Sequence, residues 1–166
     1  MKKIAILLIV ICLLIPTMSF AAGSVTATRT KIDVAFMAGR GIQKVVISWT
    51  ADAADGTVPS TSLNTALAAS GGIVPLVGWS CYMAVTDPGA TAPTDDYDIV
   101  LNDEYGADIF GTAINDRDTT STEQAFPIVA TGTYRSRLVT GNLTFGLSNN
   151  AVNSAVGQCI LYFILE

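Results

Sequence analysis

A run of carboxylates in the middle of the chain is the feature best suited to chemistry. Asp95, Asp96 and Asp98 stand close together, five more acidic residues follow before position 119, and Arg117 is the one basic residue among them. Clustered loop carboxylates can supply the roughly six to eight oxygens that calcium takes, although this spacing is not that of an EF-hand loop. Two interpretations stay open: a solvated acidic surface, and a weak calcium site at Asp95, Asp96 and Asp98.

Two cysteines, Cys81 and Cys159, lie beyond the first 21 residues, both in apolar segments. In an exported protein such a pair can form a disulfide between the sheets, which typically adds about 2–4 kcal/mol of stability. The alternative is two buried free thiols that pack as small hydrophobic side chains. Two cysteines without histidine make only half of a zinc site, so we expect no zinc.

The residue types that common enzymes need are missing or unsupported. The chain has no histidine, which excludes Ser–His–Asp hydrolases, Cys–His proteases and His-ligated zinc sites. A carboxylate pair that hydrolyses glycosides needs a groove, and Trp49, Trp79 and most tyrosines fall at inward positions of the expected strands. The sequence Gly39-Arg40-Gly41 is a turn rather than a phosphate loop. We therefore expect no enzymatic activity and no cofactor beyond the weak calcium candidate.

The charge balance bears on the partners. Residues 22–166 carry fourteen acidic and seven basic residues, a net charge of −7. An acidic domain without a basic cluster is a poor ligand for nucleic-acid phosphates. We expect no nucleic-acid partner.

The first 21 residues differ from the rest. Lys2 and Lys3 precede an entirely apolar run over residues 4–15, and Ser19 and Ala21 place small residues before a cleavage point at Ala22. This layout predicts a secretory signal peptide. The run is shorter than the about 20 apolar residues of a membrane span. An uncleaved anchor and a hydrophobic arm buried in an assembly are the alternatives, and membrane contact is expected only through residues 1–21, if they are retained.

From residue 24 on, apolar and polar side chains alternate in short segments separated by turn residues. Val45, Ile47 and Trp49 form one such set, and 62–69 is the strongest helical segment. Alternation with period two predicts antiparallel sheets with one buried face. We expect residues 22–166 to form a single all-β domain, an antiparallel two-layer β-sandwich of about seven or eight strands.

Four local expectations follow from the same pattern. One strand runs over 32–36, and another over 77–85 with Cys81 facing inward beside Trp79 and Met83. A hairpin joins strands at 97–101 and 107–111, and a tight turn lies at 141–142. The last run, 159–165, is apolar on both faces, so it is either a central strand or an edge strand covered by a partner subunit.

Several motifs occur in an order that resembles small structural proteins of tailed bacteriophages. The loop and strand at 85–101 (VTDPGATAPTDDYDIVL) come first, followed by a hairpin at 103–108 and the segment NDRDTTSTEQ at 115–124. A GNLT strand at 141–144 and the apolar strand at 157–165 complete the series, which covers about residues 42–165. The resemblance implies a virion-associated, non-enzymatic β-protein of the head or tail, and it assigns no site residues.

Two main hypotheses result. The first is a structural subunit that forms homo-oligomers or joins other structural subunits in a virion. The second is an exported bacterial β-sandwich, either a periplasmic or surface binding module or a subunit of an extracellular filament. The leader and a Cys81–Cys159 bridge would support the second, because virions of tailed phages assemble in the cytoplasm. A carboxylate-dependent hydrolase is the least supported alternative.

Overall fold

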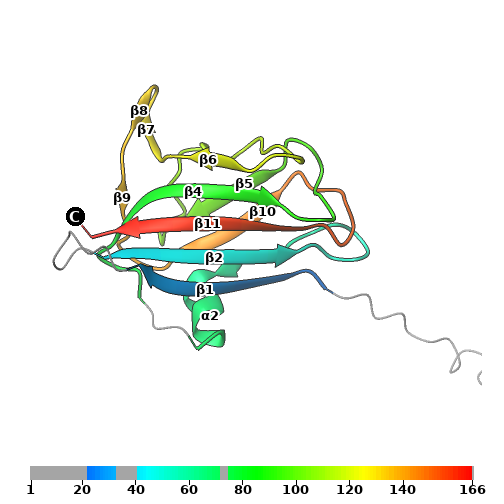
Figure 1. Cartoon of the computed structure of the whole chain (residues 1–166), viewed down its shortest axis with the longest axis horizontal. Helices are drawn as coiled ribbons and strands as arrows, with labels where there is room; N and C mark the ends of the chain where they lie inside the picture. The colour runs from blue at the N-terminus through cyan, green and yellow to red at the C-terminus, as the bar shows by residue number, and fades with distance from the viewer. Residues whose placement is uncertain (1–21, 33–40, 72–74, 166) are drawn as a thin grey trace, which may run out of the picture.

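The computed structural model describes residues 22–32, 41–71 and 75–165 of the 166. Two antiparallel sheets pack face to face (Figure 1), so the predicted all-β sandwich is confirmed. The larger sheet has six strands, and all its pairings are antiparallel. In spatial order its strands are β1 (Ser24–Ile32), β2 (Ile42–Thr50), β11 (Val156–Ile164) and β4 (Ser80–Pro88), with β6 (Glu123–Ala125) and β9 (Arg137–Leu138) both paired to β4.

The second sheet has three strands and lies behind the first in Figure 1. Its order is β3 (Thr61–Ser62), β10 (Thr144–Ser148) and β5 (Asp98–Asn102). Helix α2 (Leu63–Ala69) begins where the Ser62 side chain accepts a hydrogen bond from the backbone N–H of Thr65, a typical N-cap. The predicted short helix is confirmed, and it buries one face, formed by Leu63, Ala66 and Leu67.

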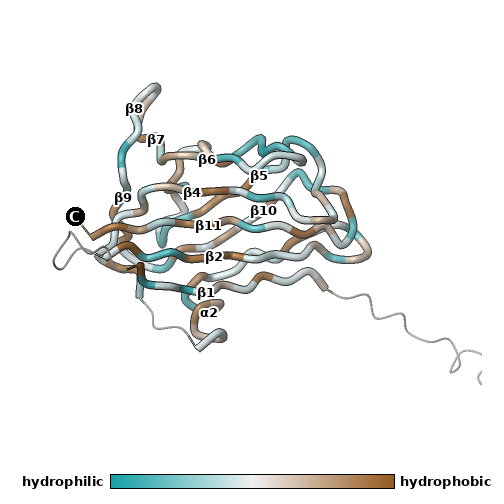
Figure 2. Tube along the Cα trace, in the orientation of Figure 1, coloured by the Kyte–Doolittle hydropathy of each residue, from teal (hydrophilic) through white to brown (hydrophobic). Residues whose placement is uncertain are grey.

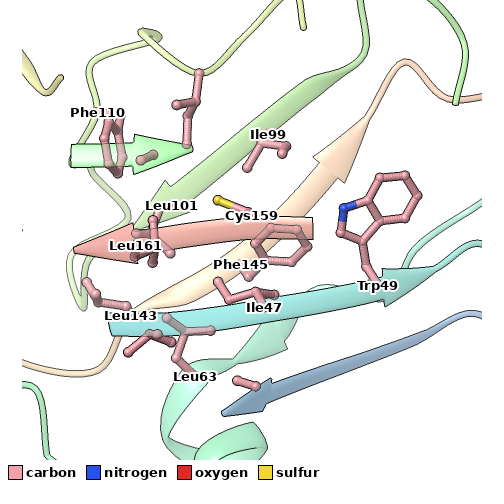
Figure 3. Close-up of a cluster of buried hydrophobic side chains, with 14 of the residues drawn as sticks. Ile47, Trp49, Leu63, Ile99, Leu101, Phe110, Leu143, Phe145, Cys159 and Leu161 are labelled. Carbon is pink, nitrogen blue, oxygen red and sulfur yellow. The ribbon is translucent and has the colours of Figure 1, made fainter. Parts of the chain in front are cut away.

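The core lies between the two sheets because both present their alternating apolar side chains to this space. Ile47 and Trp49 from β2 and Leu161 from β11 meet Ile99 from β5 and Phe145 from β10 (Figure 3). All five side chains are buried. The inward positions that alternation with period two predicts for Ile47 and Trp49 are therefore confirmed.

The C-terminal strand β11 is central. It pairs with β2 along its whole length, from Val156 opposite Thr50 to Ile164 opposite Ile42. On its other side it pairs with β4. This placement decides between the two alternatives for the apolar terminal run, and no partner subunit is needed to cover its edges.

A bulge in β4 makes part of the sequence prediction wrong. Tyr162 is opposite Met83 but Phe163 is opposite Cys81, so Tyr82 is an extra residue. One extra residue reverses the alternation beyond it. Cys81 faces the core as predicted, but Met83 does not share its face and is only partly buried. Inward positions after the bulge belong to two other side chains, Ala84 and Thr86.

The turn at 103–106 is confirmed, but the strand expected at 107–111 is absent. Asp108 forms only a single bridge, with Asn102. Its carboxylate then accepts hydrogen bonds from the backbone N–H groups of Phe110 (3.0 Å) and Thr112 (2.6 Å), and so turns the chain away. Carboxylates that bind nearby N–H groups compete with strand pairing in this way.

Three further expectations have mixed outcomes. The segments on either side of 141–142 enter different sheets, since β9 pairs with β4 and β10 pairs with β5. Of the strand expected at 32–36, Ile32 ends β1 and 33–40 lie outside the described residues. Eleven strands occur in the described ranges instead of seven or eight, because five strands of two or three residues are too short to show an alternating pattern.

Among the described residues, no helix has the length and apolar character that a membrane span requires.

Candidate interaction surface

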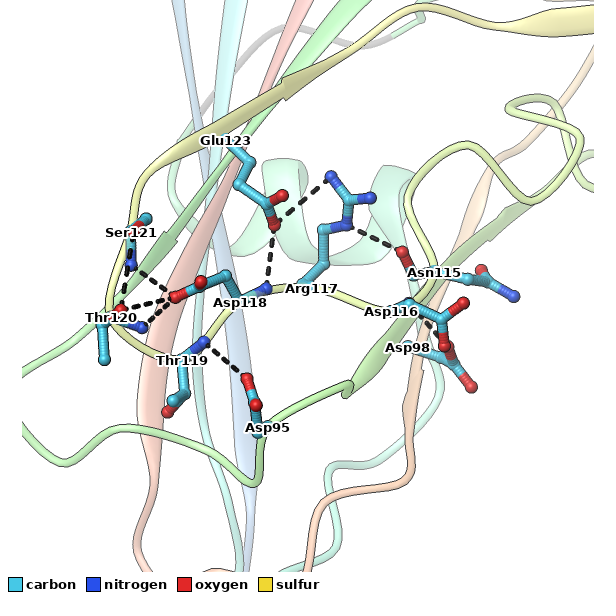
Figure 4. A network of polar contacts seen from close by, with 10 residues as sticks. All are labelled: Asp95, Asp98, Asn115, Asp116, Arg117, Asp118, Thr119, Thr120, Ser121 and Glu123. Atoms are coloured by element: carbon cyan, nitrogen blue, oxygen red, sulfur yellow. Dashed lines mark hydrogen bonds and ion pairs between the residues drawn. The ribbon is translucent and has the colours of Figure 1, made fainter.

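The acidic residues brace their own loops (Figure 4). Asp95 accepts a hydrogen bond from the backbone N–H of Thr119 (3.3 Å). Asp98 accepts one from the backbone N–H of Asp116 (3.0 Å) and another from the side-chain amide of Asn149. Each carboxylate thus fastens a later loop to the start of β5.

The same network continues around Arg117. Glu123 accepts a hydrogen bond from the backbone N–H of Asp118 (2.8 Å) and lies 3.5 Å from the Arg117 guanidinium. The Arg117 Nε in turn donates to the backbone carbonyl of Asn115 (2.9 Å). These contacts fix the path of the chain that leads into β6.

Calcium binding at Asp95, Asp96 and Asp98 stays a prediction. Within the described ranges, no three histidine, cysteine or acidic side chains are grouped so that they could hold a metal ion. Asp95 and Asp98 both accept hydrogen bonds from backbone N–H groups of one segment, at Thr119 and Asp116, and Asp96 is exposed with a positive φ of 62°. The observed role of Asp95 and Asp98 is therefore to hold the backbone of a neighbouring segment in place by accepting hydrogen bonds.

Asp118 should make one loop sensitive to acid. Its carboxylate accepts hydrogen bonds from the hydroxyl and backbone N–H of Thr120 and from the backbone N–H of Ser121, and these lower its pKa. A lowered pKa in the folded state means a stabilising effect present above the unfolded value of about 3.9 and lost as pH falls through the folded pKa. We expect the Thr120 and Ser121 amide NMR signals to shift together below about pH 4. Asp118→Asn removes this titration, and unchanged wild-type signals down to pH 2 would contradict the assignment.

Cys81 and Cys159 are free and buried in the structure. They lie on the same sheet, where Cys159 is opposite Thr86 and Cys81 is opposite Phe163. Cys159 and Phe163 are four residues apart on β11, a distance of about 13 Å, so Cys81 is at least that far from Cys159. A disulfide needs Cα atoms about 4.4–6.8 Å apart. The structure therefore has the buried thiols of the second alternative rather than a bridge between the sheets.

Both thiols should be unreactive in the folded protein. Burial raises the pKa of Cys159 to about 12 and also raises the pKa of Cys81 well above its ordinary value. The thiolate is the reactive form. We expect iodoacetamide at pH 8 to leave both cysteines unmodified in native protein and to modify both in denaturant, as shown by peptide mapping. A cross-linked Cys81–Cys159 peptide in non-reduced protein would contradict this.

The six-stranded sheet has a second face, which we call the outer face. It looks toward the viewer in Figure 1, and none of the described elements crosses in front of it. Antiparallel sheets usually carry polar side chains on a solvent face. The outer face instead carries apolar side chains that are partly or well exposed: Ile32, Ile42, Val46, Met83, Val85, Ile160, Tyr162 and Ile164.

The strand register arranges the outer face in rows. Val46, Ile160 and Val85 stand directly opposite one another in the central row. Figure 2 shows hydrophobic colour along parts of β2, β4 and β11, whereas the loops near β6 are hydrophilic. Tyr82 and Phe126 extend the apolar area beyond β4, with ring centroids 5.6 Å apart and 45% and 38% exposed. Exposed, contiguous apolar areas are typical of interaction sites.

A polar residue borders each side of the central row. Lys44 on β2 is opposite Tyr162, and Asp87 on β4 is opposite Gln158; both charged residues are half-buried. Beside Asp87 lies a depression of about 340 Å³, lined also by Ser48 and Gln158. The face therefore has an apolar centre with one basic and one acidic residue on opposite sides.

A hairpin formed by β7 (Ile128–Ala130) and β8 (Thr133–Tyr134) projects from the sandwich in Figure 1. Val129 is 41% and Tyr134 is 64% exposed on it. Two short strands are at best marginally stable alone. The hairpin is thus a second exposed surface with apolar side chains.

Only part of the outer face has a signal in the sequence. The apolar run at 159–165 pointed to a strand covered on both sides, and its outward side chains Ile160, Tyr162 and Ile164 do lie on this face. The alternation predicts Met83 on the core side, because the bulge leaves no trace in the sequence pattern. The pairing of β4 with β11, which joins them to one surface, has no local sequence signal.

Comparisons with known proteins add little to this geometry. No protein-family model and no curated protein matches the chain. Among solved structures, the chain is similar to one named "Cyanophage Pam1 capsid asymmetric unit", with 17% identity over 89% of this chain and 88% of that chain and a TM-score of 0.36. A TM-score this low does not establish a shared fold.

Proposed function

We propose that the chain is a non-enzymatic structural subunit of a tailed-phage virion, in the head or tail, and that it associates with copies of itself. The observation that carries the proposal is the outer face, a broad apolar surface on a sheet whose other face already supplies the core. Burial of apolar surface stabilises an interface by about 25 cal/mol per Å² removed from water. A monomer would leave this surface exposed.

Three features of the chain agree with this role. The ordered motifs between residues 42 and 165 resemble virion-associated β-proteins. The acidic side chains that would be the first choice for catalysis brace loops by accepting backbone hydrogen bonds, as Asp98 and Asp118 do. The net charge of −7 over residues 22–166 favours protein partners over nucleic acid.

An exported β-sandwich is the second candidate. The basic start and apolar run within residues 1–15 favour it. The free thiols of Cys81 and Cys159 add nothing to its support.

The test is to isolate the protein from its native source. Particles are separated by gradient sedimentation, and the chain in each fraction is measured by intact mass, with and without reductant. The proposal predicts that the chain sediments with large particles that contain other structural proteins, and that reductant does not change its mass. Recovery of a chain that begins at Ala22, from the cell envelope or medium and outside any particle, would support the exported module and overturn the proposal.

A further inference from the structure

We infer that two copies of the chain pack outer face against outer face, with Lys44 of each copy paired to Asp87 of the other. This inference rests on the proposed function, and it identifies the surface and the partner. The occupant of the outer face is then a second copy of the same chain.

The charges on the outer face are arranged symmetrically about Ile160. Ile160 lies between Val46 on β2 and Val85 on β4. Lys44 is two residues along β2 from Val46, opposite Tyr162. Asp87 is two residues along β4 from Val85 and pairs with Gln158. Gln158 and Tyr162 lie on either side of Ile160 along β11, so Asp87 is displaced toward one end of β11 and Lys44 toward the other. Lys44 and Asp87 are therefore at equal and opposite displacements from Ile160.

A two-fold axis exploits this arrangement. The axis lies in the plane of the interface, over Ile160, and is at right angles to the line from Lys44 to Asp87. It places Lys44 of each copy over Asp87 of the other. Such an isologous contact uses the same patch on both copies and closes as a dimer. It forms two opposite-charge pairs around an apolar centre.

The strand geometry of this dimer agrees with known sheet packing. Neighbouring strands lie about 4.8 Å apart, and two residues along a strand advance about 6.7 Å. With these spacings, the axis makes the strands of the two copies cross at roughly 70°. Face-to-face sheets prefer aligned packing or crossings near about 90°, so the charge pattern leads to an arrangement close to the orthogonal class.

The surface also has room for the charged side chains. The depression of about 340 Å³ beside Asp87, lined by Ser48 and Gln158, can receive the end of a lysine side chain from the partner. Both Lys44 and Asp87 are already half-buried in the single chain. Part of their desolvation has therefore occurred before association, which lowers the cost of pairing them.

Charge reversal tests the pairing. Lys44→Asp and Asp87→Lys are made singly and together in the full chain, and the dissociation constant is measured by sedimentation equilibrium at low salt. Each single variant places like charges opposite each other in both pairs, and we expect its dissociation constant to rise by roughly tenfold or more. The double variant, and an equimolar mixture of the two single variants, restore opposite charges and should return close to wild-type association.

Arg135→Asp is the matched control, because Arg135 is an exposed basic residue that follows β8 of the projecting hairpin and is not one of the residues that form the outer face. It should leave association unchanged, and far-UV circular dichroism checks the fold of every variant. If single reversals have no effect, or if neither the mixture nor the double variant restores association, the pairing is wrong while self-association stands. If the wild-type chain does not associate at all, the self-association in the proposed function fails together with the inference.

Discussion

Removal of residues 158–166 is expected to unfold the domain rather than release a folded subunit. The deletion takes away most of β11, which pairs with β2 on one side and with β4 on the other. It also removes the buried side chains of Cys159, Leu161 and Phe163. Full burial of a large apolar side chain is worth about 1.5–3 kcal/mol, and a whole domain is stable by only about 5–15 kcal/mol. Loss of the two large apolar side chains, Leu161 and Phe163, together with the hydrogen bonds of both strand pairings, exceeds the stability of the domain.

Thermal unfolding followed by circular dichroism checks this expectation. The truncated chain should show no cooperative transition, and its NMR amide signals should collapse into a narrow range. A control that removes only residues 165–166, beyond the end of β11 at Ile164, should unfold like the full chain. A truncated chain that keeps a cooperative transition but no longer forms oligomers would show instead that β11 is an intersubunit strand.

Ile160→Lys is expected to abolish association without unfolding the chain. Ile160 lies at the centre of the outer face and is only partly buried, so the folded single chain has room for a lysine with its amine in water. In the dimer the two substituted positions meet at the two-fold axis, where the contact loses apolar burial and gains two like charges. We expect the dissociation constant to increase by more than about a hundredfold, which corresponds to about 2.7 kcal/mol.

Val129→Lys provides the matched control for this variant. Val129 is also an exposed apolar residue, but it lies on the projecting hairpin formed by β7 and β8. Sedimentation velocity should show Ile160→Lys as a monomer with a wild-type circular dichroism spectrum, and Val129→Lys associated like the wild type. The reverse result would assign association to the hairpin.

The sequence was sufficient for the sandwich because long strands with one buried face show clear alternation. Val45, Ile47 and Trp49 are inward as predicted. A one-residue bulge leaves no mark on the residue types, so the sequence does not show that the inward and outward positions are exchanged at Tyr82. The prediction that Met83 faces the core is therefore wrong. The strand expected at 107–111 is absent for a similar reason. The carboxylate of Asp108 accepts hydrogen bonds from nearby backbone N–H groups, and the residue types of this segment do not reveal these bonds.

The candidate sites were harder to predict because they depend on which strands become neighbours. Cys81 and Cys159 both proved to be buried, but the sequence could not show that they lie on one sheet at different heights. The acidic run indicates clustered carboxylates, but the residue types alone do not show that Asp95 and Asp98 accept backbone hydrogen bonds from the segment at 116–119. The outer face appears only once β4, β11 and β2 stand side by side, which is a long-range property of the fold.

Sedimentation equilibrium of the full wild-type chain, over a range of concentrations, tests the central claim most directly. If the outer face joins copies of the chain, the weight-average mass should rise with concentration toward at least twice the mass of one chain. A constant mass equal to that of a single chain, up to the highest soluble concentration, would contradict the claim that the chain works by self-association.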